Sequence, residues 1–503
     1  MSRLAVSCFV LLASLFFNGP LCAESRDTPL ISPRLANHHG MERAWFTQLR
    51  LDPGAGGVED LRLHVSSTSA QTIFRVISER GPVYSFSNRD LNPFGERLGE
   101  EGAKDAAAEK ARLLRLRGIE SRTEQAVVPD IVVYVTTHSG LVHAIDAETG
   151  RIIWTTGVGS IRYPTTSAAA TDTRVAVVNG QHLFVLDASN GAILEDRRVL
   201  GGPPAGPAIV GDEVFVPLLS GQIRAYEIGP DARPWVLGYH SLGRVDTAPT
   251  VAGDRVVWAN TTGDVTVVVA GKDSVQSRFR LDQPIAGHVI FVPPHQIVAV
   301  TRNGVIYSFD LQSDRLMWRY ASGCETREPV AVVGGVLYFA TRDYGMFALS
   351  AATGESLWPQ SYASAKKFLA ASSTHVFCIS DLGHLATLDA QTGHPIGRIP
   401  INMSDQGFSN MQTDRAYIVT ESGVLQCLHE LGADLPTLHL EESPEDKEDA
   451  EEAKPAAGEA ATSEPPAAAS ATESPKLFPG EEVDEAPPEE KPTPPKGDEN
   501  PFE

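Results

Sequence analysis

Histidine is the residue type from which a metal site or a general base would first be expected, and its spacing here predicts neither. His38 and His39 are adjacent, but no further ligand follows them at the spacing of a zinc site. Four more histidines are scattered over separate predicted strands and turns: His138, His182, His384 and His429. The chain also carries no glycine-rich phosphate loop and no nucleophile elbow. These observations predict no metal site, no bound cofactor and no catalytic residue.

The cysteines are equally uninformative about catalysis. Three of them lie beyond residue 23, and an odd number leaves at least one thiol unpaired unless it pairs between chains. Cys378 and Cys427 lie in alternating apolar stretches, which predicts that both are buried as small hydrophobic residues. Cys324 lies in the predicted loop Gly323-Cys324-Glu325, so we expect it to be the exposed thiol. The sequence does not decide the redox state of any of the three.

A different set of side chains suits binding rather than catalysis. Arginine and aromatic residues are enriched at the centres of protein interfaces, and here they gather, with two lysines, in turns and connections between short predicted strands. We predict that these residues form a partner-binding face: Arg162, Tyr163, Arg244, Arg302, Arg327, Arg342, Tyr344, Lys366, Lys367 and Phe368. The competing interpretation is that loops are simply where charged residues collect.

These turns recur because the chain repeats about every 40 residues. Glycines mark the same turn at Gly140, Gly180, Gly221, Gly263, Gly304, Gly345, Gly383 and Gly423. Around each turn, short runs rich in Val, Ile, Tyr, Phe and Thr alternate between apolar and polar residues, which is typical of half-buried strands. Several short strands in each unit of 40 to 45 residues indicate a β-propeller. We predict a mainly β fold with eight blades over residues 126–440.

A second turn in each repeat predicts how neighbouring blades meet. The pattern places Asp, then Gly four residues later, then Trp four further on, and it is complete at Asp146, Gly150 and Trp154. Partial copies supply the other predicted blade-docking residues: Asp310, Trp318, Gly354, Trp358, Asp389 and Gly393. Glycine allows the tight turn, and the large apolar Trp can pack between adjacent sheets.

This unit resembles the quinoprotein-type propeller repeat. That repeat is shared by pyrroloquinoline quinone (PQQ) dehydrogenases and by the propeller lipoprotein of the outer-membrane β-barrel assembly machinery. The resemblance implies the fold, with either PQQ and calcium in a central funnel or a scaffold without cofactor. The dehydrogenases use a Glu and an Asn on the metal, an Asp as base and a pair of adjacent cysteines over the cofactor. No adjacent cysteines occur here and the repeats are compact, so the chain is more similar to the assembly propeller.

The segment before the repeats does not follow the 40-residue period. Residues 44–51, 61–65, 72–77 and 83–87 read as strands, and residues 100–117 read as a helix that ends at Gly118. We predict a small separate α+β domain over residues 41–125. The alternative is a ninth, degenerate hairpin that turns at Gly81 and carries the helix as an insertion.

The two ends of the chain predict export and an unstructured tail. Residues 1–23 resemble a secretory signal, with Arg3, an apolar stretch and Ala23 before the cleavage point, and residues 24–40 read as a linker. Residues 441–503 hold 20 acidic residues and five lysines, so they supply 15 of the 22 net negative charges. Their Pro, Ala and Glu content predicts disorder. Lipidation at Cys22, which would give weak membrane association, stays open, and we find no transmembrane segment.

Together these features predict a non-catalytic, exported scaffold that binds proteins in a bacterial cell envelope. The mild acidity of the remaining chain argues against a nucleic-acid partner. Two alternatives stay open: a PQQ- and calcium-dependent quinoprotein dehydrogenase, and a propeller that binds a polysaccharide or small ligand in its funnel. A role in outer-membrane assembly itself does not follow from the sequence alone, because it contains no clean lipidation motif and no recognised partner motif.

Overall fold

The computed structural model describes residues 30–439, apart from positions 53, 55, 79–83, 231, 234–236, 327 and 403. The predicted signal (residues 1–23) and the predicted acidic tail (residues 441–503) therefore lie outside the described residues. Within the described part, short antiparallel strands dominate, and the helices are α1 (Pro33–His38) and α2 (Gly99–Leu116). The predicted mainly β class is confirmed.

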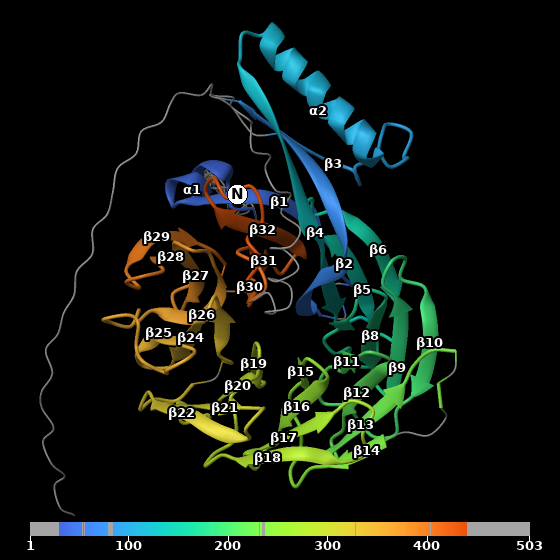
Figure 1. The fold of residues 1–503 in the computed structure, drawn as a ribbon, viewed down its shortest axis with the longest axis vertical. Coiled ribbons are helices and arrows are strands. Elements are labelled where there is room, and N and C mark those ends of the chain that lie inside the picture. Colours follow the sequence, from blue (N-terminus) through green and yellow to red (C-terminus); the bar gives the residue numbers. More distant parts are fainter. Residues whose placement is uncertain are drawn as a thin grey trace, which may run out of the picture. The chain divides into compact units, whose positions relative to one another are not determined.

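The described strands form eight antiparallel sheets, which we number in chain order and which follow one another around a common centre (Figure 1). Sheet 1 contains β2 (Val58–Ser78), β3 (Tyr84–Ser87), β4 (Ser121–Thr137), β5 (Leu141–Asp146) and β6 (Ile152–Gly157), and sheet 2 contains β7 (Ala169–Ala170), β8 (Arg174–Asn179), β9 (His182–Asp187) and β10 (Ile193–Arg198). Sheet 3 contains β11 (Ala208–Val210), β12 (Glu213–Pro217), β13 (Gln222–Glu227) and β14 (Leu237–His240), and sheet 4 contains β15 (Thr250–Ala252), β16 (Arg255–Ala259), β17 (Asp264–Val269) and β18 (Val275–Arg280).

Sheet 5 contains β19 (Ile290–Val292), β20 (Gln296–Val300), β21 (Val305–Asp310) and β22 (Arg315–Ala321), and sheet 6 contains β23 (Ala331–Val333), β24 (Val336–Thr341) and β25 (Gly345–Ser350). Sheet 7 contains β26 (Ala365–Ala371), β27 (His375–Ser380), β28 (His384–Asp389) and β29 (Pro395–Pro400), and sheet 8 contains β30 (Gln406–Phe408), β31 (Ala416–Val419), β32 (Val424–Glu430) and β1 (Met41–Gln48). In each sheet the first strand lies innermost and the last lies outermost (Figure 1). The hydrophobic core is divided among the spaces between neighbouring sheets.

Seven of the eight repeat glycines lie at the turn between the second and third strands of a sheet, and Gly140 lies at the equivalent turn of sheet 1, between β4 and β5; all eight have positive φ. Gly304, with φ 76°, shows why the turn requires glycine: a Cβ there would lie 1.9 Å from the carbonyl oxygen of Cys324. Such a backbone conformation is unfavourable for residues with a side chain. The 40-residue period of the sequence therefore reflects one hairpin turn that recurs in every sheet and whose backbone conformation is unfavourable for residues with a side chain.

Strand β1 joins the last sheet instead of a separate domain. It pairs antiparallel with β32, from Met41 opposite Glu430 to Gln48 opposite Val424. Trp45 and Leu49 then share a buried cluster with residues of sheets 8 and 1, among them Tyr417 and Ile145. The amino-terminal strand thus completes sheet 8. Helix α1, which lies inside the segment predicted as a linker, packs against the same region through Ala36.

The expected boundary at residue 125 also differs from the structure, because β2 and β4 are long strands that belong to sheet 1 and continue beyond it. They pair with each other from Val58 opposite Thr137 to Ser78 opposite Ser121. Their outer halves, with β3 and α2, form a projection that has its own small core (Figure 1). Ala103, Ala107 and Ala111 of α2 pack there on Phe74 and its neighbours. The predicted strands and helix are present, but they form an extension of sheet 1.

Candidate partner-binding face

Tryptophans join neighbouring sheets of the ring that carries the candidate face. Each lies in or beside the outermost strand of one sheet and donates its indole N–H to a backbone carbonyl of the next sheet. The four bonds are Trp45 to Ala147 (2.7 Å), Trp154 to Ala188 (2.9 Å), Trp318 to Ala351 (2.9 Å) and Trp358 to Ala390 (2.8 Å). The ring of each Trp also lies on the glycine of the Asp-x-x-x-Gly type of turn in the next sheet, for example Trp318 on Gly354.

Sheets without this Trp use other residues at the same junction. Glu195 of β10 accepts the N–H of Gly229 at 2.6 Å, and Tyr239 of β14 donates to the carbonyl of Lys272. Ser277 of β18 donates to Asp314 at 2.5 Å. Asp314 stands where the Asp-x-x-x-Gly type of turn has its glycine. It is the one non-glycine residue with positive φ (55°) among the described residues. These substitutes carry no motif, so sequence inspection did not identify them.

The glycine turns and the sheet-to-sheet connections lie at the same end of the ring. The residue after an outermost strand donates its N–H to the turn glycine of its own sheet, as Val158 does to Gly140 (2.8 Å) and Leu281 to Gly263 (2.8 Å). The turns and connections therefore form one continuous rim. This geometry brings most residues of the predicted partner-binding face to one end of the molecule.

Arg302 and Arg342 lie on this rim on either side of the connection that contains Glu325. The backbone of this connection bonds to both turns: Thr326 N–H donates to the Arg302 carbonyl (3.1 Å), and Arg342 N–H donates to the Glu325 carbonyl (2.9 Å). Arg342 also forms an ion pair with Glu325 at 3.3 Å. A cavity of about 320 Å³ lies beside them, lined by residues that include Arg302, Glu325 and Asp246.

The other basic residues of the rim lie in separate places. Lys366 and Lys367 line a second cavity of about 350 Å³ between sheets 7 and 8. Arg162 and Tyr163 are exposed on the connection between sheets 1 and 2. Arg244 lies between sheets 3 and 4 and pairs with Asp246 at 3.3 Å. Tyr344 is exposed on its turn.

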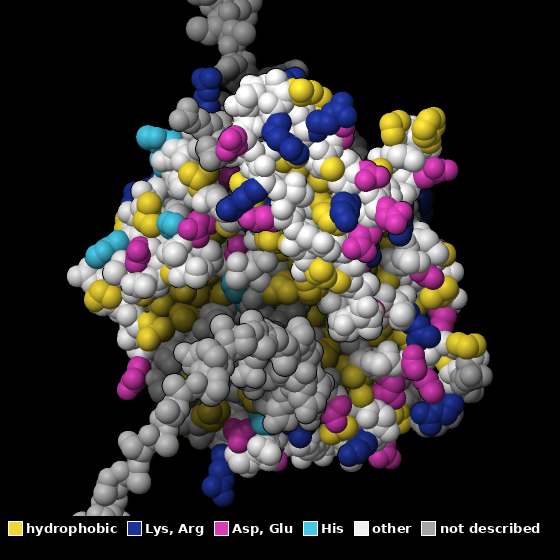
Figure 2. All heavy atoms as spheres, turned by 45° about the horizontal axis from the view of Figure 1, so that its top comes forward, with side chains coloured by type: hydrophobic (Ala, Val, Ile, Leu, Met, Phe, Trp, Pro, Cys, Tyr) yellow, Lys and Arg dark blue, Asp and Glu magenta, His cyan; other side chains and the backbone are white. Residues whose placement is uncertain are grey.

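The predicted face differs from the structure at Phe368 and in the acidic partners of its cations, and one of its residues, Arg327, cannot be placed. Phe368 is only 4% exposed and stacks on Tyr338 at 5.2 Å between ring centres, because its strand turns this side chain into the core. Arg327 lies outside the described residues. Acidic partners accompany several of the cations, as Glu328 does Lys367 at 3.9 Å. Figure 2 likewise shows basic and acidic side chains intermixed on the visible surface, with no extended face of one sign.

The three cysteines within the described residues, Cys324, Cys378 and Cys427, are buried and free. The prediction that Cys324 is exposed was wrong: 6% of the residue is accessible, and its thiol donates to Asp343 at 3.1 Å. Burial raises the pKa of Cys378 and of Cys427 to about 12, with nearby Arg398 and Arg415 respectively opposing the shift. Neither thiol is therefore ionised, or nucleophilic, at neutral pH.

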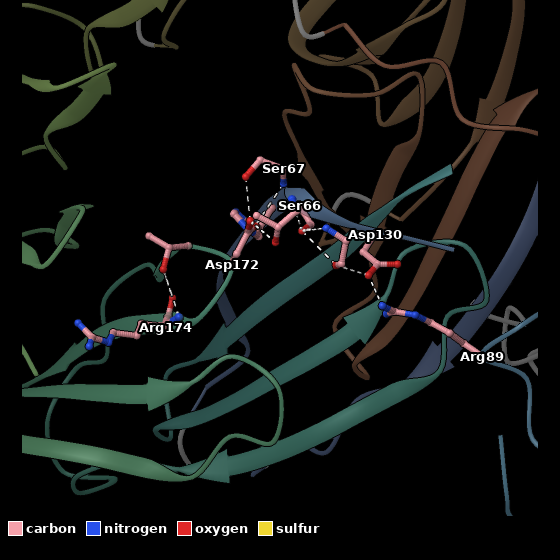
Figure 3. A network of polar contacts seen from close by, with 10 residues as sticks. Ser66, Ser67, Arg89, Asp130, Asp172 and Arg174 are labelled. Carbon is pink, nitrogen blue, oxygen red and sulfur yellow. Dashed lines mark hydrogen bonds and ion pairs between the residues drawn. The ribbon is translucent and has the colours of Figure 1, made fainter. Parts of the chain in front are cut away.

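A polar network ties the projection to the ring (Figure 3). Asp172, in the turn between β7 and β8, lies 2.7 Å from His64 and accepts hydrogen bonds from Ser67 (2.8 Å) and Thr68 (2.8 Å), where β2 is irregular. Partial burial raises the pKa of Asp172, but these bonds outweigh burial and hold it below its usual range. On the other side, Arg75 pairs with Asp434.

Sequence patterns do not single out this network, because its members are ordinary serines, threonines and aspartates far apart in the chain. Asp130 joins it by accepting from Ser69 and pairing with Arg89, at the base of the projection (Figure 3). The projection is thus held at several points by polar contacts, some half-buried, as at Asp130, and some exposed, as at Ser67. Among the described residues, none of the helices is long and apolar enough to cross a membrane.

The central funnel does not suit PQQ with calcium. Calcium in proteins takes several oxygen ligands, mainly carboxylates. The described residues that line the central cavity include no Asp or Glu, and no cluster of three potential metal ligands occurs in the described part of the chain. No step of PQQ chemistry can be derived from these side chains.

Comparison with known proteins identifies relatives of the repeats. A family model described as "Outer membrane protein assembly factor BamB" matches residues 89–302 and 261–416. Curated proteins of that name from Yersinia pestis and Burkholderia pseudomallei are 23% and 26% identical over 252 and 243 residues, which is 46% and 45% of this chain. The matches span 64% and 62% of those relatives, so the chain covers somewhat less than two thirds of their length.

Two solved structures are also similar. The crystal structure of BamB from Moraxella catarrhalis gives a TM-score of 0.49 with 20% identity, over 60% of this chain and 91% of that one. The computationally designed Ika8 protein gives a TM-score of 0.47 with 17% identity, over 59% of this chain and 93% of that one.

Proposed function

The chain belongs to the family of the outer membrane protein assembly factor BamB. Because of this membership, we propose that it is a non-catalytic scaffold of the bacterial cell envelope. In this proposal an eight-bladed propeller binds envelope proteins through its rim and supports assembly of outer membrane proteins. The family match supports the proposal most directly. The resemblance predicted from the repeat, to the assembly type of quinoprotein-like propeller, is confirmed by that match.

The rim around Arg302 and Arg342 is the proposed docking site. Two arginines and an exposed Tyr344 beside a cavity are the kind of groups that anchor protein interfaces. Glu325 neutralises part of their charge, which favours a partner surface of mixed charge over a strongly acidic one. Export by residues 1–23, the linker from residue 24 and the acidic tail from residue 441 remain part of the proposal.

Alanine substitution of Arg302 and Arg342 together tests the docking site. We expect the double variant to lose most of its capture of outer-membrane assembly proteins from native envelopes, with an unchanged melting temperature, because both side chains are exposed. A photo-crosslinking residue at position 302 should yield adducts with the same proteins. Undiminished capture by the double variant would contradict the proposal.

The matched control removes two arginines away from the rim. Arg112 and Arg122 are exposed on the projection, so their double alanine variant loses the same charge without changing the rim. We expect this control to capture partners as the unchanged protein does. Equal losses in both variants would indicate a nonspecific effect of net charge.

Reconstitution with PQQ and calcium separates the scaffold from the enzymatic alternative. Because the described funnel lining holds no carboxylate, we expect calorimetry to detect no binding and a dye-linked alcohol oxidation assay to detect no turnover. Binding accompanied by turnover would replace the scaffold proposal with a quinoprotein dehydrogenase.

A further inference from the structure

The innermost strands enclose a cavity of about 410 Å³ at the centre of the ring. Its walls come from seven of the eight sheets, and they include the turn Gly334-Gly335 between the first and second strands of sheet 6. Such turns lie at the end of the ring opposite the glycine turns of the rim. The volume is in the range of small-molecule sites. A ligand here would therefore leave the rim free.

The wall is apolar except for a few groups. Sixteen of its 24 described lining residues are hydrophobic, including Ile209, Val251, Ile290 and Phe291. Arg62 is the one lining residue with a formal charge, and none is acidic. The Arg62 side chain is 40% exposed and pairs with Asp60, so its attraction for an anion is partly screened, and the apolar wall has to supply much of the binding of any ligand.

Arg62 retains hydrogen-bonding capacity toward the cavity. Its Nε donates to Asp60 at 2.8 Å, and Asp60 does not line the cavity. The structure gives the two terminal nitrogens of Arg62 no partner among the described residues. A guanidinium presents these nitrogens as a fork that fits a carboxylate with two parallel hydrogen bonds.

The remaining polar groups of the wall leave Arg62 as the anchor for charge. Burial, together with the charge of Arg62, lowers the pKa of His288 to about 3, so this imidazole is neutral at physiological pH. Gln412 contributes a buried side-chain oxygen without a partner, which is an acceptor for a donor on a ligand. The planar fork of Arg62 matches the two oxygens of a carboxylate, and a phosphate monoester, with nearly two negative charges, would be repelled more strongly than a carboxylate by the nearby Asp60.

We propose that the central cavity binds an amphipathic monocarboxylic acid. Its carboxylate pairs with the terminal nitrogens of Arg62, and its alkyl or aromatic part lies along Val251, Ile290 and Phe291. This site is distinct from the protein-binding rim and does not depend on the assembly role.

Calorimetric titration of the mature chain with decanoate, and with the neutral analogue decanol, tests the site. We expect decanoate to bind at least tenfold more tightly than decanol. Arg62→Ala should remove this preference by weakening decanoate and leaving decanol unchanged. Arg112→Ala, on the projection, should change neither affinity. Absence of decanoate binding, or equal binding by Arg62→Ala, would overturn the proposal.

A second variant covers the case in which Arg62→Ala does not fold. Val251 is 39% exposed and borders the cavity, so Val251→Trp should fill it at little cost in stability. We expect this variant to melt as the unchanged protein does and to bind neither decanoate nor decanol. Retained decanoate binding would place the ligand elsewhere and refute the assigned site. Tighter binding of decyl phosphate than of decanoate would refute the assigned head group.

Discussion

Gly304 combines a left-handed backbone with a close approach to the neighbouring connection, and these two constraints can be separated by substitution. Gly304→Ala should lower the melting temperature, because the new Cβ would meet the Cys324 carbonyl as well as an unfavourable φ. Gly253 is the control, since it also has positive φ (64°) but a Cβ added there would meet no atom within 4 Å. Gly253→Ala should cost about 1–2 kcal/mol, and a Gly304→Ala loss no larger than this would contradict the steric argument.

The junction tryptophans yield a second prediction at the residue scale. Trp154→Phe keeps an aromatic ring but removes the indole N–H that Ala188 accepts, which should cost about 1 kcal/mol. Trp154→Ala should cost about 3–5 kcal/mol because the packing on the next sheet is also lost. Urea unfolding measures both. Met317→Ala, at a half-exposed position of β22, should stay within about 0.5 kcal/mol; similar losses for all three would refute a special role for the junction.

At the scale of elements, Asp172 fixes the direction of the projection. The pKa of Asp172 is lower in the folded protein than in the unfolded chain. Its contribution to folded-state stability is therefore fully present above the usual carboxyl pKa and is lost as pH falls through the pKa of the folded state. Asp172→Asn should therefore speed amide hydrogen exchange in the outer half of β2 at pH 7. In the unchanged protein, exchange in this segment should become faster only in strong acid. Asp196→Asn is the control, because Asp196 pairs with His182 at an exposed site outside this network. Unchanged exchange in Asp172→Asn would refute the clamp.

At the scale of the whole molecule, the ring depends on its first strand. Removing the residues before Leu49 deletes β1, and so leaves β32 without its outer partner and Ala147 without Trp45. We expect this shortened chain to aggregate, or to melt far below a chain that starts at Leu30 and retains β1. Size-exclusion chromatography and thermal unfolding compare the two. A monomer of normal stability without β1 would show that the ring does not need this closure.

Local patterns predicted local structure well, and they failed where partners lie far apart in the chain. The glycine turns and the docking Trp residues follow from the spacing of the repeat, and α2 follows from its local composition, because each depends on residues close together in the chain. The assignment of residues 41–125 to a separate domain missed the pairing of β1 with β32 and the continuity of β2 through a polar irregularity. Neither Arg62 in the cavity nor Asp172 in the clamp carries a sequence signal, because their surroundings come from different sheets.

The pairing of Met41 with Glu430 has a consequence for the time course of folding. The two residues are 389 positions apart (430 − 41), so β1 is made long before its partner strand. Contacts at such separation form slowly, and an unpaired strand edge is open to association with other chains in the meantime. An exported chain would meet this delay after it leaves the cytoplasm. Protection by a periplasmic chaperone during that interval, rather than extra native-state stability, is what this fold would need most.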